Sequence, residues 1–248
     1  ASGSNAIGEA LRMIRHGYAD AVIAGGAEAA INASAVAGFA NMLALSTSQN
    51  PDEASLPFDQ RRGGFVIGEG AVALVLEEYE HAKKRGAEIY GEVCGYGSTC
   101  DAYHITAPHP EARGGAQAMT DAMKEAGYCE EDIVYINAHG TGTPMNDVIE
   151  TAAIKKALGE EKAGQAYVSS TKSMTGHMLG AAGALEALAC LRALNEGIIP
   201  PTINLLEQDE ACDLNCVPNT AVKADITLAL SNSLGFGGHN ACLAFRKV

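Results

Sequence analysis

Short β-like apolar runs alternate with helical runs along this chain, and glycine-rich turns separate them. The alternation predicts a layered α/β fold in which helices cover sheets. We expect helices at residues 5–16, 36–45, 79–85, 116–126, 147–158 and 178–194. We expect strands at residues 20–24, 65–67, 71–77, 133–137, 167–169, 225–230 and 241–245. Gly25 and Gly26 are expected to end the first strand, and strands 65–67 and 71–77 are expected to pair with each other.

The length and charge of the chain limit what it can be. Its 248 residues, 47% of them hydrophobic, make one large domain or two modest ones, with a boundary expected near residues 86–88. A formal net charge of −13 argues against a surface built for nucleic acid or for an anionic membrane. No apolar run reaches the ~20 residues that span a bilayer, and no segment resembles a signal peptide. We therefore expect a cytoplasmic protein.

The seven cysteines form no ligand or disulfide pattern. Their number is odd, and no Cys-x-x-Cys pair occurs. A disulfide framework or a zinc site needs such spacing. We therefore expect a reduced protein whose cysteines are small core residues, with no metal site.

The densest polar loop follows the expected strand 133–137. It contains His139, and then Gly140, Thr141, Gly142 and Thr143. Open α/β sheets place ligands at the carboxyl ends of their strands. The two glycines let a ligand approach the backbone, and the two threonines offer hydroxyl groups. The pattern favours a functional site over a simple turn in which the histidine is hydrogen-bonded.

A second candidate loop lies between the expected strand 167–169 and the most apolar helix, 178–194. It carries Lys172 and His177. Because that helix must be buried, an unpaired lysine beside it would be costly. Glu186 is the only acidic residue in the helix, so we expect it to pair with Lys172. A structural ion pair explains this lysine and this glutamate but leaves the histidine unexplained.

Two further segments are rich in glycine. One places Phe236 among Gly235, Gly237 and Gly238, between the last two expected strands. Backbone N–H groups in such a turn can bind an oxyanion, and a phenylalanine on glycine hinges can move, but a tight turn with a packed phenylalanine fits equally well. The other segment, residues 56–71, is interpreted as architectural, with internal ion pairs expected from Arg61, Arg62 and Glu69.

Together these segments resemble the β-ketoacyl-acyl-carrier-protein synthases of the thiolase superfamily, and most of all the type II condensing enzymes of bacterial fatty acid synthesis. The segments PFDQRRGGFVIGEGA, NAHGTGTPMND, SSTKSMTGHMLGAAG and SNSLGFGGHN carry the resemblance, which runs over essentially all 248 residues. It implies a thiolase-like α/β fold of αβαβα layers built from two similar halves. Residues 1–87 would be the remainder of an N-terminal half that is incomplete in this chain, and residues 88–248 would form the C-terminal half.

The resemblance also implies a chemistry. The nucleophilic cysteine of the family would immediately precede Ala1, and none of the seven cysteines present matches it. His139 and His177 match the two histidines that stabilise the enolate formed when a malonyl group loses CO₂. Lys172 matches the lysine that tunes the surroundings of His177. The implied activity is an acyltransferase reaction, the decarboxylative Claisen condensation of an acyl-enzyme with malonyl-acyl-carrier protein, which elongates a fatty acid by two carbons.

The same resemblance implies substrate contacts and partners. Thr141 and Thr143 match the threonines that hydrogen-bond the phosphopantetheine arm. Phe236 matches both a backbone oxyanion donor and a gatekeeper side chain, and Gly235 and Gly237 beside it are expected to bind substrate. The expected partners are acyl-carrier protein and a second copy of the chain. No metal or organic cofactor is expected, because the substrates travel on the phosphopantetheine of the carrier protein.

Two alternatives stay open. A polyketide ketosynthase would share these residues. A catalytically inactive partner subunit, like a chain-length factor, would lack the nucleophile, although the presence of His139, Lys172 and His177 favours the active enzyme. A thiolase is disfavoured, because a thiolase would place a second reactive cysteine in the loop that here reads GFGGHN, residues 235–240.

Overall fold

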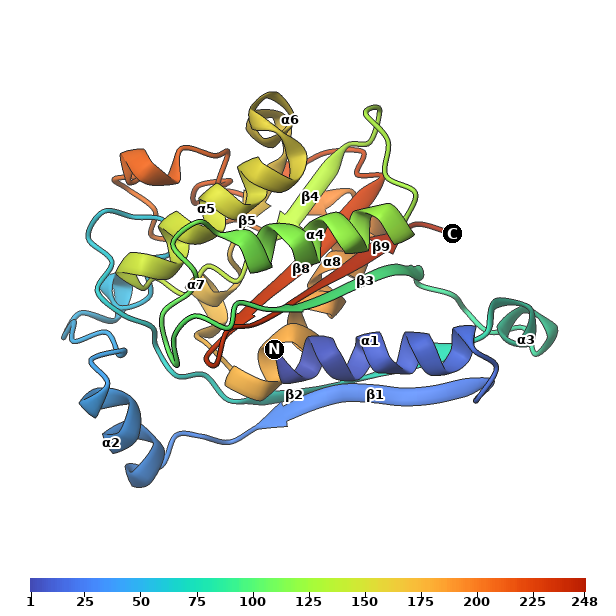
Figure 1. Cartoon of the computed structure of the whole chain (residues 1–248), viewed down its shortest axis with the longest axis horizontal. Coiled ribbons are helices and arrows are strands. Elements are labelled where there is room, and N and C mark those ends of the chain that lie inside the picture. Colours follow the sequence, from blue (N-terminus) through green and yellow to red (C-terminus); the bar gives the residue numbers. More distant parts are fainter.

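The computed structural model describes residues 1–248 as layers of helices and sheets (Figure 1). The longer helices are α1 (Ser2–Arg15), α2 (Ala33–Asn41), α4 (Arg113–Glu125), α5 (Pro144–Leu158) and α8 (Ala182–Glu196), and the short ones are α3 (Tyr79–Lys84), α6 (Glu160–Gln165) and α7 (Lys172–Thr175). The strands are β1 (Ala21–Glu28), β2 (Gly70–Glu77), β3 (Glu92–Cys100), β4 (Val134–Asn137), β5 (Tyr167–Ser169), β6 (Ile198–Ile199), β7 (Val222–Lys223), β8 (Leu228–Gly235) and β9 (His239–Arg246).

A five-stranded mixed sheet with the strand order β3-β9-β8-β4-β5 forms the centre of the fold. Strand β4 runs parallel to β5 and β8, and β9 runs antiparallel to β8 and β3. Strands β1 and β2 form a separate antiparallel pair, and β6 and β7 form a third, very short pair. Parallel β4 and β5 follow one another with α5 between them, as expected for a βαβ crossover.

Helices α1 and α8 lie between the two larger sheets (Figure 1). Helix α1 contacts β1, β3 and α8, while α8 contacts β2 and β8. Helix α4 covers the other face of the five-stranded sheet, over β3 and β9, and α5 packs beside α4. The order of layers is therefore sheet, helices, sheet, helices, which confirms the layered α/β architecture and matches four successive layers of a thiolase-like fold.

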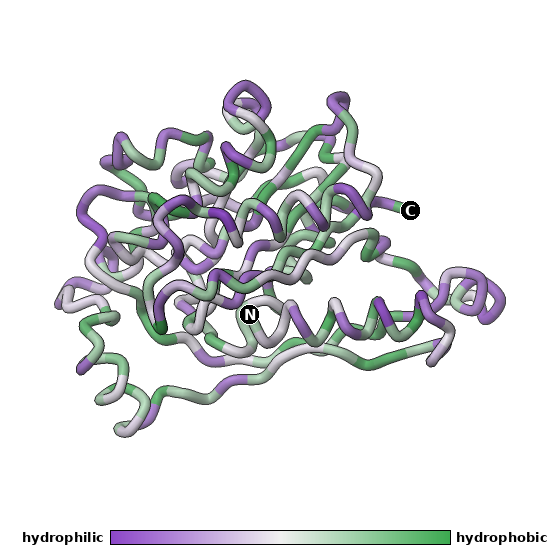
Figure 2. The backbone as a smooth tube through the Cα atoms, in the orientation of Figure 1, coloured by the Kyte–Doolittle hydropathy of each residue, from purple (hydrophilic) through white to green (hydrophobic).

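The hydrophobic core fills both faces of the five-stranded sheet. A cluster of 22 buried residues, including Ile136, lies on the α4 side of the sheet, and a cluster of 20, including Ile7 and Tyr135, lies on the side of α1 and α8. Successive strand residues point to opposite faces, so a strand covered on both sides reads as a continuous apolar run. Figure 2 shows hydrophobic residues along the central strands and hydrophilic ones around the outlying helix α6.

Glycines allow α4 to lie directly on β3. A Cβ atom at Gly95 would lie 2.0 Å from Ala122 O, and one at Gly97 would lie 1.9 Å from Ala118 O. Side chains at these two positions would push the helix off the sheet, so the spacing of helix and strand depends on both glycines.

Strand β1 is longer than expected from the sequence. Gly25 and Gly26 do not end it, because they pair with Ala73 and Val72 in the ladder with β2, and β1 continues to Glu28. A Cβ atom at Gly25 would lie 2.0 Å from Val72 O. These glycines therefore serve a close approach of backbones rather than a turn.

The expected pairing of residues 65–67 with 71–77 is wrong, because β2 pairs with β1. Phe65 and Ile67 instead form single bridges to Leu45 and His177. Gly68, which lies between these two segments, packs against the loop after α7, where its N–H donates to His177 O at 3.0 Å. A Cβ atom at Gly68 would lie 2.4 Å from Thr175 O, so the sequence needs glycine there for packing.

The helices are short. The longest, α5 and α8, have 15 residues each. None has the combination of length and apolar character that crossing a membrane requires.

The outer face of the β1–β2 pair is exposed, which affects how the 248-residue chain behaves when it is expressed alone. Ile23 and Val75 face each other across the pair and are 76% and 64% exposed, and neither outer edge has a neighbouring strand. Open edges and exposed apolar surface favour association. We predict that the 248-residue chain, expressed alone, self-associates or stays unfolded in size-exclusion chromatography with light scattering. A monomer that melts in one cooperative transition would contradict this.

Candidate active site

A cavity of about 520 Å³ opens where segments from both ends and the middle of the chain meet. Its wall includes Ala1 at the start of α1, His139 and Thr143 from the loop after β4, His177 from the loop after α7, and Phe236 from the turn between β8 and β9. Its volume is within the range of small-molecule binding sites. The three loops singled out in the sequence therefore converge on one cavity.

His139 follows the fully buried strand β4 and is itself buried, with 6% exposure. The turn after it depends on Gly140, whose φ of 34° lies in the left-handed region. A Cβ atom at Gly140 would also lie 2.6 Å from the Ser170 side chain. Local sequence and close packing together direct the chain so that the histidine faces the cavity.

His177 is held on both its backbone and its ring. Its N–H donates to Val66 O at 2.7 Å, and its ring Nδ1 accepts a hydrogen bond from Leu179 N at 3.1 Å. A neutral imidazole that accepts at Nδ1 carries its proton at Nε2. Phe65 packs edge-on against the ring, with centroids 5.2 Å apart. The tautomer and the orientation of His177 are thus both defined.

The two histidines form a pair. Their ring centroids lie 5.2 Å apart with an interplanar angle of 85°. Burial lowers the pKa of each ring well below its usual value, and the charge of Lys172 acts in the same direction. Both imidazoles are therefore neutral at pH 7, so each ring carries one N–H, and in His177 that N–H is at Nε2.

Lys172 and Glu186 form a buried ion pair, as expected from the sequence. Both side chains are 2% exposed, and Lys172 Nζ donates to Glu186 Oε1. Burial raises the pKa of Glu186, whereas the neighbouring ammonium group opposes that change. The pair places a fixed positive charge close to the two histidines and so helps to keep them neutral.

Thr141 and Thr143 both line the cavity beside His139. Their Oγ1 atoms lie 3.0 Å apart and share a hydrogen bond. Gly142 between them has a φ of 75°, which suits glycine and turns both hydroxyl groups to the same side of the loop. The two hydroxyl groups form a small polar patch on an otherwise largely apolar wall.

The turn between β8 and β9 brings Gly235 and Phe236 to the cavity but leaves Gly237 outside its lining. The N–H groups of Gly237 and Gly238 donate to Ile105 O and Gly235 O. The N–H of Phe236 donates to no acceptor within the chain, and its side chain is 47% exposed. Of the groups in this turn, the Phe236 N–H is therefore the one free to bind a ligand.

Two acidic residues of α5 hold the His139 loop, a role that is not predicted from the sequence. Glu150 accepts hydrogen bonds from His139 N and Gly140 N, both at 2.7 Å, and Asp147 accepts one from Gly142 N at 3.2 Å. Burial raises the pKa of Glu150 to about 7 and also raises that of Asp147. The available signal was two acids three residues apart in the helix after the loop, which places them on one helix face.

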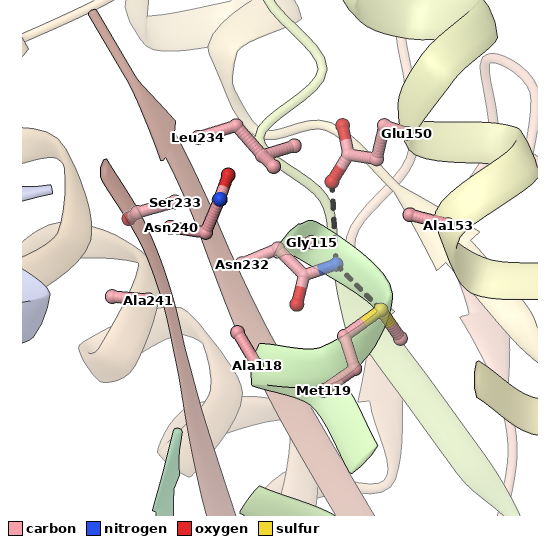
Figure 3. Close-up of a pocket in the computed structure, with 10 residues that line it drawn as sticks. All are labelled: Gly115, Ala118, Met119, Glu150, Ala153, Asn232, Ser233, Leu234, Asn240 and Ala241. Carbon is pink, nitrogen blue, oxygen red and sulfur yellow. Dashed lines mark hydrogen bonds between the residues drawn. The ribbon is translucent and has the colours of Figure 1, made fainter. Parts of the chain in front are cut away.

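Behind the loop lies a much smaller cavity, of about 10 Å³ (Figure 3). Glu150 reaches its wall, where Asn232 Nδ2 donates to Glu150 Oε1 at 3.3 Å and lies 3.4 Å from Met119 Sδ. This cavity has room for about one water molecule and none for a substrate. Its importance is that Glu150 ties the histidine loop to β8 in the central sheet.

The ion pairs expected in residues 56–71 are found in part. Arg61 pairs with Asp59, and Arg62 pairs with Asp209. Glu69 forms no such pair and instead accepts a hydrogen bond from Ile31 N at 2.8 Å.

The neutral state of the histidine pair can be tested directly. We predict that neither His139 nor His177 titrates with the midpoint of an ordinary imidazole, because burial and the Lys172 charge lower both pKa values. NMR of the intact protein labelled in its histidine rings would measure this, with variants lacking each histidine to assign the signals. A midpoint near 6.5 for either ring would contradict the prediction.

Comparisons with known proteins show which family the chain resembles. Residues 1–82 match the family model described as the N-terminal domain of β-ketoacyl synthase, and residues 90–206 match the model of its C-terminal domain. The chain is 56% identical, over all 248 residues, to 3-oxoacyl-[acyl-carrier-protein] synthase 2 of Synechocystis sp., and 53% identical over 247 residues to the protein of that name from Staphylococcus aureus. It spans 59% of the length of each of these relatives.

Solved structures give the same result for the fold. A type II polyketide ketosynthase, determined with its acyl-carrier protein and a bound hexaketide, is 41% identical with a TM-score of 0.96, covering 99% of this chain and 60% of that one. A β-ketoacyl synthase from Burkholderia phymatum is 43% identical with a TM-score of 0.93, covering 100% of this chain and 60% of that one. Since the two domain models match in order and take in most of its length, this chain belongs to the β-ketoacyl synthase family.

Proposed function

We propose that the protein containing this chain is an acyltransferase that catalyses the decarboxylative Claisen condensation of an acyl thioester with malonyl-acyl-carrier protein in fatty acid synthesis. The observation that carries the proposal is the pair of neutral imidazoles, His139 and His177, 5.2 Å apart in the wall of one cavity. Two relatives, 56% and 53% identical to the chain, are named 3-oxoacyl-[acyl-carrier-protein] synthase 2.

The two imidazoles are suited to stabilise an enolate. When the malonyl thioester loses CO₂, the electron pair of the broken C–C bond moves into an enolate whose oxygen carries negative charge. Two N–H donors directed at that oxygen stabilise the charge without any proton transfer. The buried Lys172–Glu186 pair supports this role, because its positive charge disfavours protonation of either ring.

The acyl group in this proposal is carried by a cysteine immediately before Ala1 in the longer protein. Its thiolate attacks the incoming acyl thioester and releases the thiol of the carrier. The amino-terminal end of α1 would favour that thiolate. The enolate carbon then attacks the acyl-cysteine carbonyl, the cysteine thiolate leaves, and a β-ketoacyl chain two carbons longer remains on the carrier. The unengaged N–H of Phe236 would stabilise the oxyanion of this step.

Substrate binding is assigned to the same wall of the cavity. Thr141 and Thr143 would hydrogen-bond the phosphopantetheine arm, and their adjoining hydroxyl groups support this. Gly235 would line the substrate path, and the half-exposed Phe236 would act as its gate. Gly237 is expected from the resemblance to bind substrate, but it lies outside the cavity lining and its N–H donates to Ile105 O, so we propose that it shapes the turn instead.

The remaining assignments concern the whole protein. Acyl-carrier protein is the proposed partner, supported by the related ketosynthase that was determined with its carrier protein. A homodimer, a cytoplasmic location, the absence of any cofactor beyond carrier-bound phosphopantetheine, and the division into halves at residues 1–87 and 88–248 remain predictions.

The test uses the full-length protein with acyl- and malonyl-acyl-carrier protein as substrates. We predict that His139→Ala lowers the rate of condensation by at least about 10²–10³-fold, the usual effect of losing one oxyanion donor. His16→Ala is the matched control, because His16 is exposed at the end of α1 and should leave the rate unchanged. Malonyl decarboxylation and elongation that persist in His139→Ala would refute the assigned role.

The same assay separates the alternative functions. A single β-ketoacyl product supports fatty acid elongation, whereas repeated condensation without reduction of the keto group would indicate a polyketide ketosynthase, the function of one solved relative. No condensation by the wild-type protein, with restoration on adding a partner ketosynthase, would indicate an inactive chain-length-factor-like subunit.

A further inference from the structure

Arg62 is a buried cation that contacts the cavity loop directly. It belongs to a segment interpreted above as architectural, yet its side chain is only 5% exposed. Its Nε donates to Thr143 O at 3.2 Å, and its Nη2 donates to Pro144 O at 3.0 Å. One guanidinium group therefore binds two successive carbonyl groups at the point where the loop enters α5.

The other side of the guanidinium group is anchored. Its Nη1 donates to Asp209 Oδ2 at 2.7 Å and to Asp59 O at 3.0 Å, and its Nε lies 3.8 Å from Asp147 Oδ2. Four N–H directions of the planar group are thus used at once. A lysine has a single tetrahedral ammonium group and cannot reproduce this arrangement.

The rest of the segment supports the loop from the same direction. Gly64 N donates to Gly142 O at 3.0 Å, and Phe58 N donates to Asp147 Oδ2 at 2.9 Å. The segment is itself held by the buried Asp59, which accepts hydrogen bonds from Leu206 N and from the side chain of Arg61. Arg61 makes none of these contacts to the loop, although it is the next residue in the chain.

We infer that Arg62 is a positioning residue for the arm that carries the substrate. By fixing the carbonyl groups of Thr143 and Pro144, it sets where the Thr143 hydroxyl group lies in the cavity wall. It thereby determines how well the protein binds phosphopantetheine-linked substrates, without contacting them. The inference rests on the proposed function, which assigns Thr141 and Thr143 to that arm.

The first experiment measures steady-state kinetics of the full-length protein with malonyl-acyl-carrier protein. We predict that Arg62→Gln raises KM by about 10-fold, as expected for a lost charge-assisted hydrogen bond, while kcat changes by less than about 3-fold. Arg62→Lys should restore little of the loss, and the exposed control His16→Ala should leave KM unchanged. If Arg62→Gln only lowers Tm and keeps the KM of the wild-type protein, Arg62 is structural and the inference is wrong.

A double-mutant cycle tests whether Arg62 acts through the threonine. If it does, Arg62→Gln combined with Thr143→Val should raise KM little more than Thr143→Val alone. If the double variant instead raises KM by the product of the two separate effects, the inference is wrong. Should Arg62→Gln fail to fold, the same cycle with Arg62→Lys decides the question.

A measurement of binding without catalysis distinguishes a failure of this inference from a failure of the proposed function. The wild-type protein should bind carrier protein bearing phosphopantetheine more tightly than carrier protein without it, and Arg62→Gln should reduce that difference about 10-fold. If the wild-type protein shows no difference, the proposed function itself fails. If the wild-type protein shows the difference and Arg62→Gln keeps all of it, only the positioning role fails.

Discussion

The close approach of α1 and α8 between the two sheets is the constraint on which the site depends. A Cβ atom at Gly3 would lie 2.9 Å from Ala184 N and from Gly180 O, and one at Gly183 would lie 2.1 Å from Ser4 Oγ. Ser4 also shares a buried hydrogen bond of 2.8 Å with Ser233 in β8. Only side chains this small let the start of α1, the His177 loop and the end of β8 meet at one cavity.

Around that cavity, buried charge is balanced in two different ways. Lys172 and Glu186 form an ion pair, whereas Asp147 and Glu150 accept hydrogen bonds from backbone N–H groups of the loops that they hold, and Asp147 also lies 3.8 Å from Arg62 Nε. An unpartnered buried charge would be costly in either case. The outcome is an electrostatic environment that keeps the two histidines neutral and a loop geometry that is held by several independent contacts.

Some helices and strands of the fold are predictable from the sequence and others are not. Helix α1, strand β4 and helix α8 were expected close to their observed bounds, because each has a clear apolar pattern of its own. The predicted end of β1 and the predicted pairing of β2 are wrong, since Gly25 and Gly68 follow apolar runs and resemble the glycines of turns. Both glycines instead allow contact with a distant backbone, and nothing in the local sequence distinguishes those two uses.

The layered α/β class and the Lys172–Glu186 pair are predictable from the sequence alone, and the family resemblance points to the two histidines. The ion pair was predictable because one buried lysine needs a partner and the adjoining apolar helix has a single acid. The contacts by which Glu150 and Arg62 hold the cavity loop form only in the folded chain. Their partners are backbone groups, which every residue has, so no pattern of side chains along the chain reveals which N–H or carbonyl a distant charge will meet.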